Sequence, residues 1–144
     1  MSRWAALGEL LAALAKGVPC LEAHALWGSA RALLVAALVH ETRRTALVVT
    51  AGQAERHRTT RDLDFFLASL PGAAAPGAVL AGRRVVELPS VASPSWRGAR
   101  HRESDAERAL CCHRLLHGGA VPIVATPAAL SAPLLTPAEF RART

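Results

Sequence analysis

The chain has 144 residues, of which 51% are hydrophobic, so it suits a single domain, residues 1–144, with a core of its own, and we do not expect intrinsic disorder. No uncharged apolar run reaches the roughly 18 residues of a membrane-spanning helix, and we expect no contact with a membrane. The net charge of +6 is almost all arginine, which fits either a basic face for nucleic acid or, as the even spread of the arginines favours, solvated helix faces.

The first third of the chain predicts a helix, a strand and a second helix. Residues 2–16 carry apolar side chains at helical spacing, and Gly17-Val18-Pro19 ends that helix. Residues 24–39 (HALWGSARALLVAALV) read as a short buried strand, a tight turn at Gly28-Ser29 and a helix that starts at once. This helix is expected to continue to Glu41.

The remaining two thirds alternate between strands and helices. Three further strands are predicted at 45–50 (TALVVT), 84–88 (RVVEL) and 120–125 (AVPIVA), with helices at 51–70 and at 103–117 and an irregular loop at 89–101. A short last helix is predicted to begin at Pro127, with Thr126 as its cap. Such alternation is typical of a three-layer α/β fold, here a parallel sheet of about four strands with flanking helices. Because Pro122 lacks an N–H, we expect its strand at an edge of the sheet or on a bulge.

The helix at 51–70 is predicted to be amphipathic. Its inward positions are Ala54, Leu63, Phe66 and Leu67, and its solvent-facing positions are Glu55, Arg56, Arg58, Arg61 and Asp62. Asp62 and Asp64 are therefore interpreted as carboxylates on a solvated face rather than an acid–base pair.

The cysteines and the N-terminus indicate a cytoplasmic protein. Cys20, Cys111 and Cys112 cannot make a tidy set of disulfides, so we expect reduced thiols. The apolar stretch near the N-terminus is interrupted by Glu9 and lacks a convincing cleavage site, which argues against a secretory signal.

Residues 24–39 have the layout of a phosphate-binding loop, in which N–H groups at the start of a helix face an anion. The working signature is Gly-x4-Gly-Lys-Ser/Thr. When Arg31 is aligned with the lysine, alanines take the place of both glycines and of the Mg²⁺-binding hydroxyl residue (Ala25, Ala30 and Ala32). A vestigial phosphate loop of Gly28, Ser29 and Arg31 remains, so we expect no nucleotide cofactor and no catalysis.

Other candidate sites are weaker. His113 and His117 share a helix face, but the neighbouring Cys111 and Cys112 point about 100° apart and a structural zinc ion needs four ligands, so we expect no metal. No nucleophile elbow and no activated cysteine is present, and His24 is interpreted as a packed or surface side chain.

A tryptophan followed by two arginines is the candidate contact for nucleic acid. Trp96 could stack on a base while Arg97 and Arg100 bind phosphates. A tryptophan that packs its own loop onto the sheet is the favoured interpretation.

Three sequence segments, taken in their order along the chain, resemble those of a known protein family. They are the Gly-Ser-Ala-Arg turn at 28–31, a strand ending in Thr-Ala before a helix closing on Asp-Leu-Asp-Phe-Phe-Leu (62–67), and Ala-Glu-Arg…His-Arg-Leu-Leu-His-Gly leading to Val-Ala-Thr-Pro-Ala-Ala-Leu (106–130). Together they resemble the N-terminal UvrB-homology module of the bacterial transcription-repair coupling factor (Mfd) over about residues 5–142.

The resemblance implies a degenerate P-loop NTPase-like domain that is catalytically silent and serves as a scaffold in nucleotide excision DNA repair. Its implied partners are UvrA and the remaining domains of the coupling factor, which would follow this chain, with DNA as a further candidate. Residues 88–100 depart from the family pattern Phe-Pro-x-Trp-Glu-x-Leu-Pro, and no UvrA contact is carried over. Two alternatives stay open, namely an independent nucleotide- or phosphate-binding protein and a basic nucleic-acid-binding module.

Overall fold

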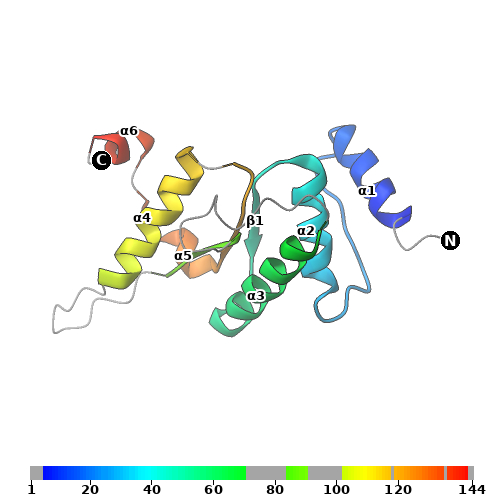
Figure 1. Ribbon diagram of the computed structural model, residues 1–144, viewed down its shortest axis with the longest axis horizontal. Helices are drawn as coiled ribbons and strands as arrows, with labels where there is room; N and C mark the ends of the chain where they lie inside the picture. Colours follow the sequence, from blue (N-terminus) through cyan, green and yellow to red (C-terminus); the bar gives the residue numbers. More distant parts are fainter. Residues whose placement is uncertain (1–4, 71–83, 91–101, 118, 135, 143–144) are drawn as a thin grey trace.

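The computed structural model describes residues 5–70, 84–90, 102–117, 119–134 and 136–142. Within these ranges the chain forms a mixed α/β structure with a small parallel sheet between helices (Figure 1). The strands are β1 (Ala46–Val49), β2 (Val86–Leu88) and β3 (Pro122–Ala125). Most of the loop predicted at 89–101, with Trp96, Arg97 and Arg100, lies outside the described residues.

The sheet has the order β1-β3-β2, and both outer strands run parallel to β3. Ala46 is opposite Pro122, and Val86 is opposite Ile123. The prediction that Pro122 marks an edge strand is therefore wrong, because β3 is the central strand. The proline is tolerated there because it is the first residue of the strand, one position before pairing with β2 begins.

Helices cover both faces of the sheet. On one face lie α2 (Ala30–Thr42) and α3 (Gln53–Ser69), and α4 (Arg102–His117) and α5 (Pro127–Ser131) lie on the other. Successive residues of β3 alternate between the two layers, as expected for a strand. Val124 joins the cluster of Ala32, Ala36, Leu63 and Val85, whereas Ile123 and Ala125 join that of Val86, Leu88, Cys111 and Ala129.

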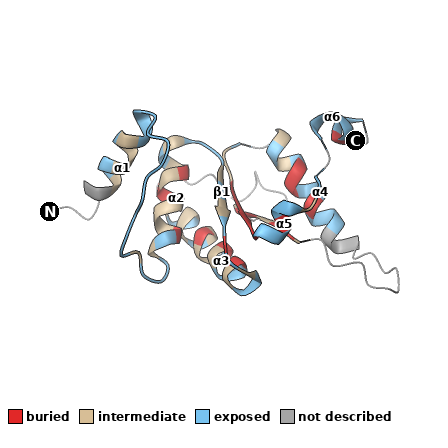
Figure 2. Cartoon of the chain, turned by 180° about the vertical axis from the view of Figure 1, so that it is seen from behind, coloured by how far each residue is buried: buried red, intermediate tan, exposed pale blue. Residues whose placement is uncertain are grey.

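Two helices lie at the ends of this layered body. The first helix, α1 (Ala5–Ala15), lies outside α2 rather than on the sheet, and α6 (Pro137–Arg141) lies beside α4 (Figure 1). In Figure 2 the buried positions gather on the inner sides of α2, α3 and α4, whereas α1 shows intermediate and exposed positions. None of the described helices combines the length and apolarity needed to cross a membrane.

The predicted helices and their ends are largely confirmed. Thr126 caps α5 by accepting a hydrogen bond from the N–H of Ala129 through its hydroxyl, and Pro127 follows at the first helical position, as predicted. At α6 the side chains of Thr136 and Glu139 form a reciprocal capping box.

The strand predicted before Gly28 does not form, so the described part of the sheet has three strands rather than four. Residues 20–27 have no regular structure, and Trp27 is 84% exposed. Ala25 has a φ of 57°, a left-handed conformation that interrupts the extended backbone a strand requires. The segment therefore reaches α2 along the outside of the domain instead of through the sheet.

The face predicted for α3 needs correction at two positions. Ala54 is exposed, and Arg56, predicted to face water, is only 5% exposed. The guanidinium of Arg56 reaches over the end of β2, where its Nε lies 3.1 Å from Glu87 Oε2 and its Nη1 donates to Leu88 O at 3.3 Å. The polar partners on β2, which the helical period does not reveal, turn this residue inward.

Candidate functional site

The turn before α2 keeps part of the backbone geometry of a phosphate loop. Gly28 has a φ of 56°, and the N–H of Ala30 donates to the carbonyl of Trp27 at 3.1 Å. Ser29 precedes the helix, but its side chain makes no capping hydrogen bond. Because the strand that should lead into the turn is missing, the turn is not held at the end of the sheet as a working phosphate loop would be.

Arg31, the residue aligned with the phosphate-binding lysine, is engaged by a carboxylate. Its Nη2 lies 3.1 Å from Glu55 Oε1, and the other oxygen of Glu55 accepts a hydrogen bond from the N–H of Ala51 at 3.0 Å. Glu55 therefore ties the start of α2 to the start of α3. Its negative charge beside Arg31 lowers the attraction of this corner for anions.

Ala32, the third replaced position, faces the core. It is 4% exposed and packs in the cluster that contains Leu63, Val85 and Val124. A methyl group in that place offers no oxygen to Mg²⁺. Of the predicted vestigial loop, the structure therefore keeps the glycine turn and the exposed Arg31 side chain, and it brings neither a metal-binding hydroxyl nor a phosphate-facing lysine beside them.

The carboxyl ends of the three strands, where open α/β sheets usually bind ligands, are joined by internal hydrogen bonds. The hydroxyl of Thr50 donates to Ala125 O at 3.3 Å, and Gln53 Nε2 donates to Ser90 Oγ at 3.1 Å. The first contact joins the end of β1 to the end of β3, and the second joins the start of α3 to the segment that follows β2. In the described part of this edge, these polar groups are therefore engaged in contacts that hold the fold together.

Arg108 on α4 is a second buried arginine at this edge. The residue is 7% exposed. Its guanidinium donates hydrogen bonds of 2.7–3.4 Å to four carbonyl oxygens, those of Pro89, Ala129, Ala132 and Pro133. The four acceptors belong to the end of β2 and to α5 with the turn after it. Arg108 thereby fixes three segments that are distant in the sequence.

Sequence reasoning missed a polar cluster between α3 and β2. His57 Nδ1 lies 3.2 Å from Glu87 Oε2, the same oxygen that faces Arg56. His57 and Glu87 line a pocket of about 240 Å³ together with Thr60, Arg61, Asp64 and Val85. The signal in the sequence was a glutamate inside the apolar strand RVVEL, since a carboxylate there needs a cationic partner. Asp64 is half-buried and accepts from the N–H of Arg84 at 2.9 Å, so it is not simply solvated.

The two cysteine candidates on α4 are buried side chains. Cys111 and Cys112 are both buried, and burial, aided by the charge of Cys112, raises the pKa of the Cys111 thiol to about 11. A thiol with this pKa is a poor nucleophile at neutral pH. Among the residues that the structure describes, no three His, Cys, Asp or Glu side chains could together hold a metal ion.

His24 lies on the surface segment before α2. Its Nε2 is 3.2 Å from Glu22 Oε2, and both side chains are largely exposed. This placement fits the surface interpretation of His24.

In comparisons with known proteins, no protein-family model matches this chain, and neither a curated protein nor a solved structure matches it.

Proposed function

We propose that the chain is a non-catalytic scaffold and docking domain of the transcription-repair coupling type, acting in nucleotide excision repair in the cytoplasm. Its fold would be a degenerate relative of the P-loop NTPase domains. The proposal rests on the resemblance of three ordered sequence phrases to the UvrB-homology module. The structural observation that supports it is the Arg31–Glu55 ion pair at 3.1 Å, which engages the residue aligned with the phosphate-binding lysine.

The arrangement of the loop supports a loss of nucleotide chemistry in three independent ways. The aligned cation is paired with Glu55, the position of the metal-binding hydroxyl is a buried alanine, and the turn is not preceded by a strand. Each of these alone would weaken binding of Mg-ATP, and together they leave the loop with a structural role. A domain that keeps an α/β core without its nucleotide site is suited to holding surfaces for partners.

The partner proposed by resemblance is UvrA. The experiment is size-exclusion chromatography of the purified chain with purified UvrA, followed by titration of the mixture at several salt concentrations. We expect a complex that persists at about 0.3 M salt, where the Debye length is well below 10 Å and exposed charges are largely screened. A basic protein of similar size and charge serves as the control for non-specific attraction.

Two outcomes would contradict this function. The first is the absence of any complex with UvrA at micromolar concentrations. The second is binding to UvrA that disappears with salt in parallel with that of the basic control, which would show attraction between net charges only.

A basic nucleic-acid-binding module is the alternative that the arginine content favours. In that case the logarithm of the affinity for DNA would fall linearly with the logarithm of the salt concentration, with a slope set by the number of phosphates contacted. Replacing both Arg97 and Arg100 by Ala would reduce the slope by roughly two contacts if residues 96–100 bind phosphates. An unchanged slope would remove this segment from the interface.

A further inference from the structure

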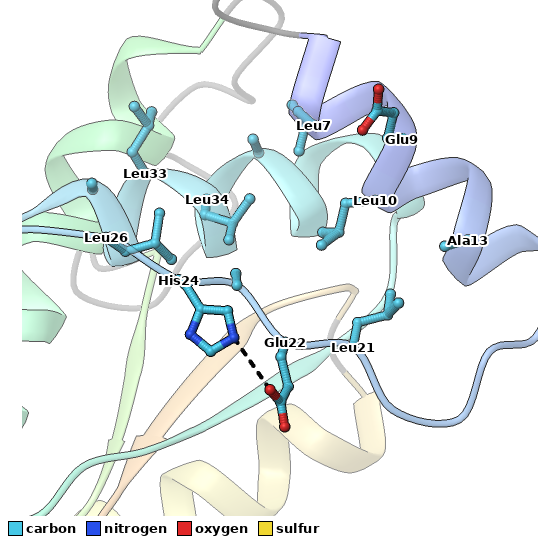
Figure 3. Close-up of a pocket in the computed structure, with 13 residues that line it drawn as sticks. Leu7, Glu9, Leu10, Ala13, Leu21, Glu22, His24, Leu26, Leu33 and Leu34 are labelled. Carbon is cyan, nitrogen blue, oxygen red and sulfur yellow. Dashed lines mark hydrogen bonds and ion pairs between the residues drawn. The ribbon is translucent and has the colours of Figure 1, made fainter.

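A pocket of about 560 Å³ lies between α1, residues 21–26 and the first turns of α2 (Figure 3). Its volume lies within the range of roughly 300–1,000 Å³ that is usual for small-molecule sites. Helix α1 forms one wall and α2 the opposite wall, and the irregular segment before Gly28 forms the third. The pocket is thus built by the part of the chain that does not enter the sheet.

The interior of the pocket is apolar. In Figure 3 leucine side chains from all three segments converge on the space between the helices. They are Leu7 and Leu10 on α1, Leu21 and Leu26 on the segment, and Leu33 and Leu34 on α2. Filling this space with an alkyl chain would remove both the alkyl surface and the leucine surface from water, which favours binding.

Two of the described residues that line the pocket carry a carboxylate, and none of those described residues is a lysine or an arginine. The carboxylates are those of Glu9 and Glu22, and His24 lies beside Glu22. Glu22 and His24 lie at the mouth, where their side chains are 78% and 83% exposed and 3.2 Å apart.

We propose that this pocket binds small amphipathic amines, with the alkyl chain among the leucines and the ammonium group at Glu22. The apolar walls select a hydrocarbon body, and the carboxylate at the mouth selects a positive head group over a neutral or negative one. Carboxylates of fatty acids are disfavoured because the Glu22 carboxylate at the mouth repels them. This site is independent of the docking function proposed above.

The test uses three probes with the same chain and different head groups, namely octylamine, octanol and octanoate, titrated calorimetrically into the full chain at low salt. Octylamine should bind about 1.4- to fivefold more tightly than octanol, because an exposed ion pair contributes roughly 0.2–1 kcal/mol, and octanoate should bind most weakly. Substituting Glu22→Gln should abolish the preference for octylamine over octanol and leave octanol binding unchanged. Since Glu22 is exposed, the variant is expected to fold normally.

A second variant tests the location. Ala13 lines the pocket from α1, whereas Ala12 is exposed and does not line it. Ala13→Phe should fill the space and weaken binding of all three probes, and Ala12→Phe should have no effect. Equal affinity for octylamine and octanoate, the same affinities in Glu22→Gln, or no binding of any probe below its aggregation concentration would each overturn the proposal.

Discussion

The start of α2 and the junction between α4 and α5 both have an arginine at their centre, but the two regions use it differently. Arg31 lies on the surface with its side chain 64% exposed, and its described partner is Glu55, whose side chain is 30% exposed. Arg108 is buried, and its guanidinium donates to four carbonyl oxygens. The first arginine forms an exposed ion pair between the starts of α2 and α3, and the second joins α4 to the end of β2 and to α5.

This difference bears on the basic composition of the chain. Arg56 and Arg108 are both buried, and each lies against acceptor groups of the protein itself, Glu87 for the first and four carbonyl oxygens for the second, so their charges serve packing rather than an external anion. A count of arginines in the sequence therefore overstates the positive charge available to a nucleic acid. Substitutions that separate these roles should differ in their effects on stability by several kcal/mol.

The largest effect is expected for Arg108→Ala. Removal of the guanidinium leaves four buried or half-buried carbonyl oxygens without their donor, and each unsatisfied buried group costs about 1–3 kcal/mol, so we expect a loss of at least about 3 kcal/mol in the free energy of unfolding. Urea unfolding followed by circular dichroism measures this loss. Arg58→Ala, at an exposed position of α3, is the matched control and should change the stability by less than about 0.5 kcal/mol. Equal losses in the two variants would show that Arg108 is not a structural centre.

A smaller loss is expected for Glu87→Gln. The substitution keeps the shape of the side chain but leaves the charge of the buried Arg56 without its carboxylate at 3.1 Å. Breaking one partner of a buried pair costs about 3–5 kcal/mol, and the second contact of Arg56, to Leu88 O, should hold the loss nearer to 2 kcal/mol. The same unfolding measurement applies, and Arg56→Met/Glu87→Gln should recover part of the loss. If the double variant loses as much free energy of unfolding as Arg56→Met and Glu87→Gln lose together, the two residues do not interact and the pairing is contradicted.

The reactivity of the thiols should differ between the buried Cys111 on α4 and the exposed Cys20 before α2. At about pH 8 a thiol reagent should modify the exposed Cys20 rapidly, whereas Cys111 should react only as the pH approaches 11, because the thiolate is the reactive form and burial raises the pKa of Cys111 to about 11. Absorbance with a chromogenic disulfide measures the rates. In Cys20→Ser the rapid phase should disappear, and a rapid phase that persists would mean that α4 is not packed as described.

The smallest effect on stability is expected for Arg31→Ala. An ion pair exposed to this degree contributes at most about 0.5 kcal/mol, so the urea midpoint should hardly move. A loss comparable to that of Arg108→Ala would mean that the start of α2 and the α4–α5 junction are not different in kind.

Local signals predicted the fold better than they predicted the site. Helical spacing and the stop signal at Gly17-Val18-Pro19 predicted α1, and Thr126 with Pro127 predicted the start of α5, because caps and periodicity act over a few residues. The burial of Arg56 could not be predicted in this way, because its partner Glu87 lies on another element. The central position of β3 depends on pairing with two strands that are far apart in the sequence.

In the candidate site too, features set by local sequence were predicted, whereas features set by contacts between distant segments were not. The alanines at positions 25, 30 and 32 indicated a decayed phosphate loop directly, since the chemistry of each residue type is known without the structure. The missing strand before Gly28 and the Arg31–Glu55 pair were not predicted. A left-handed alanine and a contact between two helices are set by tertiary packing, which periodicity in one segment does not report.

The most direct test of the proposed loss of nucleotide binding is calorimetric titration of the chain with Mg-ATP and Mg-ADP at low salt. Arg31→Ala is titrated in parallel, together with a variant that restores all four signature residues, Ala25→Gly/Ala30→Gly/Arg31→Lys/Ala32→Ser. We expect no binding up to millimolar nucleotide in any of the three proteins, because the strand that should lead into the loop does not form. Micromolar binding by the unaltered chain that Arg31→Ala abolishes would contradict this, and the chain would then be a working nucleotide-binding protein.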